Sequence, residues 1–125
     1  MGKTIVVLED DADLGRLVAE LLEEQEYNVV VVSSIEDLLV DATRRSPCVT
    51  LVDGTSSTEF DLWWLGPVLR KLGANPVVFT AHASAREEFE RDAHGYIGVV
   101  SKPFDADELV EIVSDICWEE SKAAV

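Results

Sequence analysis

TIVVLEDD, at residues 4–11, is the stretch that decides the fold of this chain. Its first five residues are short, apolar or β-branched and nearly uninterrupted, which is typical of a strand covered on both faces in a parallel sheet. Three acidic residues, Glu9, Asp10 and Asp11, follow at the point where such a strand would end. The stretch therefore predicts a buried strand that delivers carboxylates to one edge of a sheet.

Similar apolar runs recur along the chain and alternate with amphipathic stretches. The predicted strands are Thr4–Leu8, Asn28–Val32, Val49–Val52, Val77–Thr80 and Ile97–Val100. After the first run, apolar residues lie at helical spacing behind the candidate cap residues Asp11 and Asp13. Strands in strict alternation with about as many helices predict an α/β fold with a doubly wound parallel sheet.

Two later helices begin with pairs of residues that match a capping box. These pairs are Ser33 with Glu36, and Asp105 with Glu108. In such a box, the first side chain accepts a hydrogen bond from a backbone N–H of the first turn. We therefore expect helices to begin directly after Ser33 and Asp105.

The third and fourth helices are less regular in sequence. Gly66-Pro67 lies inside the third, over Leu62–Leu72. Because proline lacks a backbone donor, we expect it to break or kink this helix, or to be the first residue of a shorter one. The fourth helix, around Ala85–Ala93, is short and polar, so we expect it to be weakly held.

The composition favours an acidic globular domain. The 125 residues include 25 Asp and Glu against 10 Lys and Arg, a formal charge of −15, and 47% are hydrophobic. That apolar content provides a core and excludes a disordered acidic tail. Because such an acidic surface repels phosphate backbones and anionic lipids, we expect no direct nucleic-acid or membrane contact. We expect one domain over residues 1–125, with 119–125 as a tail or the start of a linker.

Targeting signals and cysteine usage point to the cytoplasm. No apolar run is long enough to span a bilayer, and residues 1–5 lack the apolar core of a signal peptide. Cys48 and Cys117 are isolated within apolar stretches. We interpret them as small buried residues in a reducing compartment, not as a disulfide or a metal pair.

Polar residues gather at the ends of the predicted strands. The first strand ends in Glu9 and Asp10, the third in Asp53, the fourth in Thr80, and Lys102 follows the fifth. In open parallel sheets, ligands bind outside the carboxyl ends of the strands, where the strand order reverses. One edge of the sheet is therefore predicted to collect carboxylates, a hydroxyl and an ammonium.

This set of groups suits phosphoryl transfer with a divalent cation. Carboxylates about 4 Å apart repel by roughly 4 kcal/mol per pair at an effective dielectric near 20. Mg2+ relieves that repulsion and prefers oxygen ligands. Asp53 would then act as a nucleophile that forms an acyl phosphate, with Thr80 and Lys102 binding its oxygens.

Four short motifs together resemble the receiver domain of two-component response regulators. They are IVVLEDD at residues 5–11, LVD at 51–53, VVFTAH at 77–82 and SKPF at 101–104, and the likeness covers nearly the whole chain. The resemblance implies a flavodoxin-like (βα)5 fold with strand order 2-1-3-4-5. It implies a cytoplasmic phosphoprotein that is no enzyme beyond catalysing its own phosphorylation and dephosphorylation.

The resemblance also assigns the metal site. It implies that Asp10 and Asp53 ligate Mg2+ directly, with the backbone carbonyl of Thr55 as a third ligand and Glu9 acting through water. Asp53 is implied to be the phosphoacceptor. Asp11 is most simply a helix cap.

Further residues and partners follow from the same resemblance. Thr80 and Lys102 would be the phosphoryl-binding switch residues, and His82 could tune hydrolysis from the rim of the pocket. The implied partners are a sensor histidine kinase or histidine phosphotransfer protein and an output protein or domain. A homodimer through the surface of the fourth helix, fifth strand and fifth helix is also expected.

The chain departs from the family pattern at several positions. Ser56-Ser57 replaces the usual Met-Pro after the phosphoacceptor, and Phe60-Asp61 replaces a later Asp-Gly. Val99 occupies a switch position that is usually aromatic, and Tyr96 does not fill it. We therefore expect the signal to leave the site by backbone motion after Thr80 rather than by an aromatic flip.

Two other functions remain as alternatives. Asp53-Gly54-Thr55 is similar to the motif of haloacid-dehalogenase phosphatases, but their nucleophile lies two residues earlier, where this chain has Leu51. The second alternative is a pseudo-receiver, a protein-binding module with the same fold and no regulated phosphorylation. Val99 and the altered loop after Asp53 favour the pseudo-receiver. The residues that disfavour it are the intact Glu9, Asp10, Asp53, Thr80 and Lys102.

Overall fold

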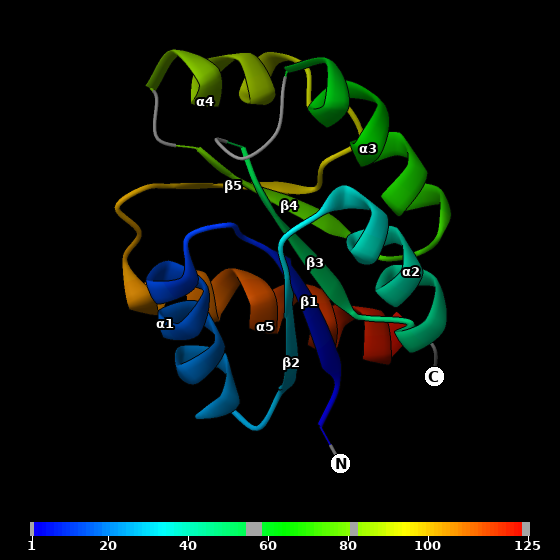
Figure 1. The fold of residues 1–125 in the computed structure, drawn as a ribbon, viewed down its shortest axis with the longest axis vertical. Helices are drawn as coiled ribbons and strands as arrows, with labels where there is room; N and C mark the ends of the chain where they lie inside the picture. The colour runs from blue at the N-terminus through cyan, green and yellow to red at the C-terminus, as the bar shows by residue number, and fades with distance from the viewer. Residues whose placement is uncertain (1, 55–58, 81–82, 124–125) are drawn as a thin grey trace.

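Strands and helices alternate along the chain in a computed structural model, which describes residues 2–54, 59–80 and 83–123 (Figure 1). The strands are β1 (Thr4–Leu8), β2 (Asn28–Val32), β3 (Val49–Asp53), β4 (Pro76–Thr80) and β5 (Gly98–Ser101). The helices are α1 (Ala12–Glu23), α2 (Ile35–Arg45), α3 (Glu59–Lys71), α4 (Ala83–Arg91) and α5 (Ala106–Ala123). The predicted strands are thus confirmed to within one residue at each end.

The described strands form a parallel sheet in the order β2-β1-β3-β4-β5. This is the doubly wound, flavodoxin-like arrangement that the sequence indicates, and it is confirmed. The chain passes from β1 outward to β2 and returns to place β3 on the other side of β1. The strand order therefore reverses between β1 and β3, and a crevice is expected outside their carboxyl ends.

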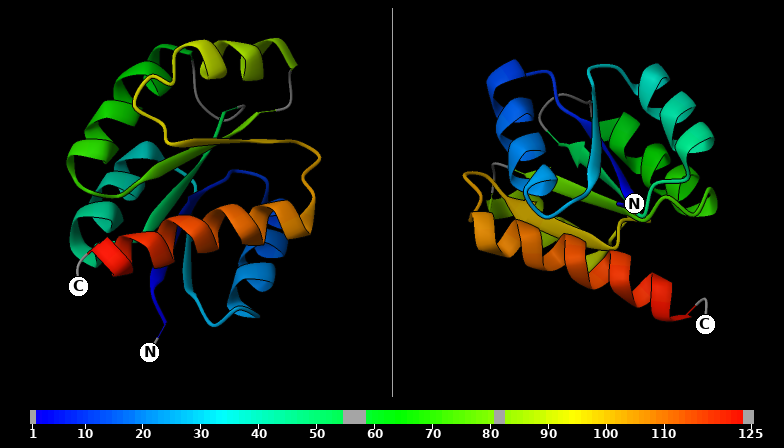
Figure 2. Two further views of the ribbon diagram at one scale, coloured as in Figure 1. Left: turned by 180° about the vertical axis from the view of Figure 1, so that it is seen from behind. Right: turned by 90° about the horizontal axis from the view of Figure 1, so that it is seen from below.

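The helices cover both faces of the sheet (Figure 2). Helices α1 and α5 pack on one face, in an apolar cluster that includes Val18, Leu22 and Val113. Helices α2, α3 and α4 pack on the other, in a cluster that includes Leu38 and Leu65. Alternate residues of β1 enter the two clusters, as expected of a strand buried on both faces. Among the described residues, no helix has the length and apolar character needed to cross a bilayer.

Short side chains cap the helices, although one cap differs from the prediction. The carboxylate of Asp11 accepts hydrogen bonds from the first turn of α1, and that of Asp105 does the same for α5. For α2 the cap is Ser34, whose hydroxyl accepts from the N–H of Asp37, so the predicted capping box at Ser33 is wrong. Two adjacent serines satisfy the same pattern, and the start of the helix decides which one caps it.

Helix α3 passes through Pro67 without a break, contrary to one of our predictions. Pro67 is exposed, so its ring lies away from the sheet and its missing donor costs one backbone hydrogen bond. Leu65 and Leu69 on either side are fully buried and hold the helix against the sheet. Tertiary packing therefore outweighs the local preference of proline.

The prediction that the two cysteines are unbonded is wrong. Cys48 and Cys117 form a disulfide, with Cα atoms 5.1 Å apart across 69 residues of sequence. Both are buried, as predicted, and they lie in the same apolar cluster. Helix α5 crosses the face of the sheet and brings Cys117 to the start of β3, which the sequence spacing could not reveal. The cysteine-based argument for a reducing compartment therefore no longer holds.

Candidate functional site

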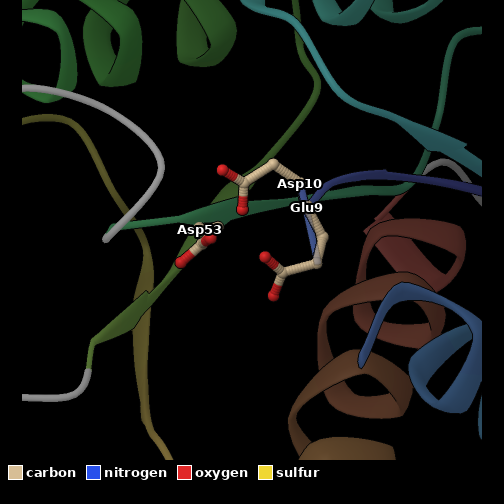
Figure 3. A group of neighbouring side chains, drawn as sticks. All are labelled: Glu9, Asp10 and Asp53. Atoms are coloured by element: carbon tan, nitrogen blue, oxygen red, sulfur yellow. The ribbon is translucent and has the colours of Figure 1, made fainter. Parts of the chain in front are cut away.

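Three carboxylates converge at the carboxyl ends of β1 and β3 (Figure 3). Glu9 and Asp10 follow β1, and Asp53 is the last residue of β3. One ligand oxygen from each lies within 4.8 Å of the others. Glu9 and Asp53 are buried and Asp10 is exposed, so the cluster is held by the sheet and opens to solvent on one side. The structure thus brings together the acidic residues that the sequence placed at this edge.

Lys102 reaches into the same cluster from the end of β5. Its Nζ donates hydrogen bonds to Oδ1 of Asp53 at 2.7 Å and to Oε1 of Glu9 at 3.0 Å. Burial acts to lower the pKa of Lys102, but the hydrogen bonds and charges of Asp53 and Glu9 outweigh it and raise the pKa. Lys102 therefore remains a cation here. The Lys102–Pro103 peptide bond, which the sequence could not assign, is cis.

Glu9 holds its proton more tightly than an ordinary glutamate. The pKa of Glu9 is raised from 4.5 to about 7, mainly by burial and also by the neighbouring Asp53, while Lys102 acts to lower it. At neutral pH the carboxyl group therefore exchanges a proton readily when no additional cation is present. Its environment favours a positive charge beside it.

The charge balance of the cluster fits a divalent cation. With all three carboxylates ionised, the three carboxylates and one ammonium carry a formal charge of −2 on groups that touch or nearly touch one another. At 4.8 Å, two carboxylates repel by about 3.5 kcal/mol at an effective dielectric near 20. All the donor atoms are oxygens, which Mg2+ and Ca2+ prefer, and the exposed side leaves room for water ligands. The residues present could therefore hold such an ion.

The backbone around Asp53 is fixed against β4. The N–H of Gly54 donates to the carbonyl oxygen of Phe79 at 2.8 Å. A Cβ on Gly54 would lie 2.6 Å from that same oxygen, so this position has no space for a larger residue. The turn after β3 therefore depends on glycine, and it holds the Asp53 backbone close to the end of β4.

Thr80 and Lys102 are also tied together at the end of the sheet. Thr80 is buried, pairs with Ser101 across β4 and β5, and accepts a 2.7 Å hydrogen bond at its carbonyl oxygen from the Lys102 N–H. The predicted Thr55 and His82 sites lie outside the described residues. A displacement of Thr80 would therefore act directly on Lys102, and a displacement of Lys102 would act directly on Thr80.

Neither Val99 nor Tyr96 forms an aromatic switch at the site. Val99 pairs with Val78 in β4 and packs against the α2–α3 side of the core. Tyr96 is buried, and its hydroxyl donates to the carbonyl oxygen of Leu62 in α3 at 3.0 Å. Desolvation by burial raises the pKa of Tyr96, so it stays protonated. The ring of Tyr96 is anchored to α3.

One contact near the site was missed from the sequence. Arg86 of α4 donates from its guanidinium to Oγ of Ser101 at 2.6 Å and pairs with Glu90 at 3.1 Å. Only the Glu90 contact, one helical turn away, has a sequence signature. The bond to Ser101 ties α4 to the residue that precedes Lys102.

Comparisons with known proteins agree with this geometry. The chain is 25% identical over 129 residues to the "Probable transcriptional regulator ycf29" of Porphyra purpurea. This alignment covers 97% of this chain and 59% of that protein. It is 26% identical over 117 residues to the "Nitrogen assimilation regulatory protein NtrX" of Azorhizobium caulinodans, over 90% of this chain and 25% of that protein. The chain thus spans less than two thirds of the length of either relative. No protein-family model matches it.

A solved structure supports the same class. The N-terminal signal receiver domain of a two-component system response regulator from Bacteroides fragilis superposes with a TM-score of 0.77 at 26% identity, over 94% of this chain and 98% of that one. The fold is therefore that of a response-regulator receiver domain. The resemblance that the sequence motifs indicate is confirmed.

Proposed function

We propose that this receiver domain is a phosphorylation-dependent switch that accepts a phosphoryl group on Asp53. The observation that carries the proposal is the position of Asp53, which is buried at the strand-order reversal beside Glu9, Asp10 and Lys102. Asp53 is thus held by the sheet at an edge that opens to solvent at Asp10, and Lys102 beside it supplies a cation that can bind phosphoryl oxygens. The domain would act as a signalling phosphoacceptor and not as a turnover enzyme.

The reaction follows from the groups at the site. A carboxylate oxygen of Asp53 attacks the phosphorus of a phosphohistidine on a partner protein, the O–P bond forms, and the N–P bond breaks. The leaving imidazole keeps the electron pair and takes up a proton from solvent. The Lys102 ammonium and the Thr80 hydroxyl donate hydrogen bonds to the phosphoryl oxygens. The product is an acyl phosphate on Asp53.

Asp10 and Asp53 would hold a Mg2+ ion, together with Glu9 through water and the Thr55 backbone carbonyl. When bound, the ion neutralises negative charge on the transferring phosphoryl oxygens. The formal charge of about −2 on the cluster supports this proposal. The chain's own contribution is to hold the carboxylates on adjacent strands before the ion arrives.

The new phosphoryl group would change the conformation through Lys102 and Thr80. Phosphorylation adds about −1.5 to −2 charges. Each charge-assisted bond to it contributes roughly 1.5–3 kcal/mol, so two such bonds give about 3–6 kcal/mol. Inverting a 1:99 equilibrium takes about 5.5 kcal/mol, so the available energy is comparable with the energy needed. Arg86 and Ser101 offer a direct route from Lys102 to α4, in place of the aromatic switch that Val99 lacks.

The partners would be a sensor histidine kinase or a histidine phosphotransfer protein, and an output protein or domain. The charge of −15 favours basic partner surfaces. We place the protein in the cytoplasm, and we propose the surface of α4, β5 and α5 for output and for homodimer formation. Light scattering with and without phosphorylation measures the dimer directly.

Incubation with a small-molecule phosphodonor and Mg2+ tests the function. We expect a stable mass increase of one phosphoryl group, its loss in Asp53→Asn, and its retention in Asp115→Asn, an exposed aspartate of α5. Phosphate release with steady turnover would instead identify a phosphatase. An unchanged mass would overturn the proposal and leave a protein-binding module.

A further inference from the structure

The Cys48–Cys117 disulfide joins the start of β3 to α5, whereas the phosphoacceptor site lies at the carboxyl ends of β1, β3 and β5. Cys48 immediately precedes β3, and Cys117 lies in the C-terminal half of α5. Both cysteines of the chain are used in this bond. The bond lies at the amino end of β3, whereas Asp53 lies at its carboxyl end. Its chemistry is therefore spatially separate from the proposed phosphorylation.

One end of the bond is firmly fixed. The N–H of Cys48 donates to the carbonyl oxygen of Thr4 at 2.9 Å, and its own carbonyl oxygen accepts from Nδ2 of Asn75 at 3.1 Å. The backbone of Cys48 is thereby held between neighbouring elements of the sheet. The disulfide connects Cys117, on a helix, to this fixed point.

The helix end is held mainly by side-chain contacts. Cys117 and Val113 are fully buried in the cluster under α5, and the next residue, Trp118, is 56% exposed. The ammonium of Lys3 lies 6.0 Å from the centre of the Trp118 ring, a weak cation–π contact. Such contacts let the end of a helix open locally more easily than a central strand. The covalent bond is therefore the strongest restraint on this part of α5.

We propose that Cys48 and Cys117 form a reversible thiol–disulfide site whose redox state sets how firmly the C-terminal half of α5 is held to the sheet. In oxidation, local opening of the end of α5 exposes Cys117, whose thiolate attacks a low-molecular-weight disulfide such as glutathione disulfide and releases one thiol. The second thiolate then displaces the second thiol and closes the bond. The pair loses two electrons and two protons, and two molecules of glutathione form.

The reduced state is compatible with the same fold. A buried cysteine thiol behaves as a small hydrophobic group, so both side chains can stay in the apolar cluster after reduction. What is lost is the restraint that closes a loop across 69 residues of sequence. In a reducing compartment, disulfides of this kind are usually transient and sensory. The bond thus provides a second input that acts on α5.

Hydrogen exchange of the full chain tests the site. Glutathione disulfide should convert the folded, reduced chain to a form that lacks both free thiols. After reduction by dithiothreitol, amides of residues 113–118 should exchange about tenfold faster or more by local opening, and amides of β1, which exchange by global unfolding, report the loss of global stability separately. Thiol titration and peptide mass spectrometry follow the two effects separately.

Two variants make the result specific. Cys48→Ala/Cys117→Ala should show the same exchange with and without dithiothreitol, and Asp53→Asn should respond to dithiothreitol as the unmodified chain does. Two thiols that stay free in the folded chain under glutathione disulfide would overturn the proposal. Equal exchange of residues 113–118 in the two redox states would overturn it as well. Because these readouts need no phosphoryl transfer, a failure of the proposed Asp53 chemistry leaves them intact.

Discussion

Replacing Lys102 by methionine removes the cation on which the acidic cluster depends. The side chain of Lys102 is 15% exposed, and its partners Glu9 and Asp53 are 3% and 1% exposed, so the ion pairs are screened little by solvent. Removing one partner of a buried ion pair costs about 3–5 kcal/mol, because the remaining charges are left uncompensated. In the presence of EDTA at about pH 8, we expect the free energy of unfolding of Lys102→Met to fall by about 3 kcal/mol.

The loss should depend on pH in a direction that Glu9 sets. Its pKa is raised from 4.5 to about 7 in the folded chain, so the folded state binds a proton that the unfolded state has released between these values. The contribution of Glu9 to stability is therefore present below about pH 4.5 and is lost as the pH rises through 7. At about pH 5, Glu9 is neutral and one repulsion is absent. The cost of Lys102→Met should accordingly be smaller at pH 5 than at pH 8.

Urea unfolding of both chains at the two pH values, followed by circular dichroism, measures these differences. Lys71→Met is the matched control, because Lys71 is exposed at the end of α3 and its replacement should change stability by less than about 0.5 kcal/mol. Mg2+ at about a hundredfold excess over its dissociation constant should stabilise the unmodified chain by about 2.7 kcal/mol. A loss below about 1 kcal/mol for Lys102→Met at pH 8 would refute the reasoning, as the cluster would then not need its cation.

Three further substitutions probe the packing around the site. Gly54→Ala should lower the free energy of unfolding by about 1–3 kcal/mol in urea, because the new Cβ would lie 2.6 Å from a carbonyl oxygen of β4. Tyr96→Phe should cost about 1 kcal/mol in the same assay, because it removes the 3.0 Å hydrogen bond to Leu62; an unchanged midpoint would contradict this. Arg86→Met should speed amide exchange in α4 and leave α1 unchanged, because it removes the 2.6 Å bond to Ser101.

The strands and the acidic site were predictable because their signals are local. A buried parallel strand must be apolar along its whole length, and its carboxyl end must meet solvent, so β1 and Glu9-Asp10 were visible in consecutive residues. The carboxyl ends of parallel strands share one edge of the sheet, so the polar residues that follow them were expected to lie together. The residue types at this edge of the sheet could therefore be predicted before any distance was known.

What could not be predicted depends on contacts between distant residues. The Cys48–Cys117 bond requires the path of α5 across the sheet, which no spacing rule gives. The continuity of α3 through Pro67 is decided by packing on both sides of the proline. Arg86 resembles any surface arginine until Ser101 is found 2.6 Å away. In each case a local preference was either silent or overruled by tertiary structure.

The two proposed regulatory sites lie at opposite ends of β3, with Cys48 just before its first residue and Asp53 as its last. Strand β3 is buried along its whole length and hydrogen-bonded to β1 and β4, so it cannot slide in response to a change at either site. A change at Cys48 must therefore act outward on α5, and a change at Asp53 must act outward through Lys102 and its neighbours on β5 and α4. The two effects would reach different parts of the same proposed output surface through separate contacts. Since sites without shared partners usually contribute additively, oxidation and phosphorylation should combine rather than exclude each other.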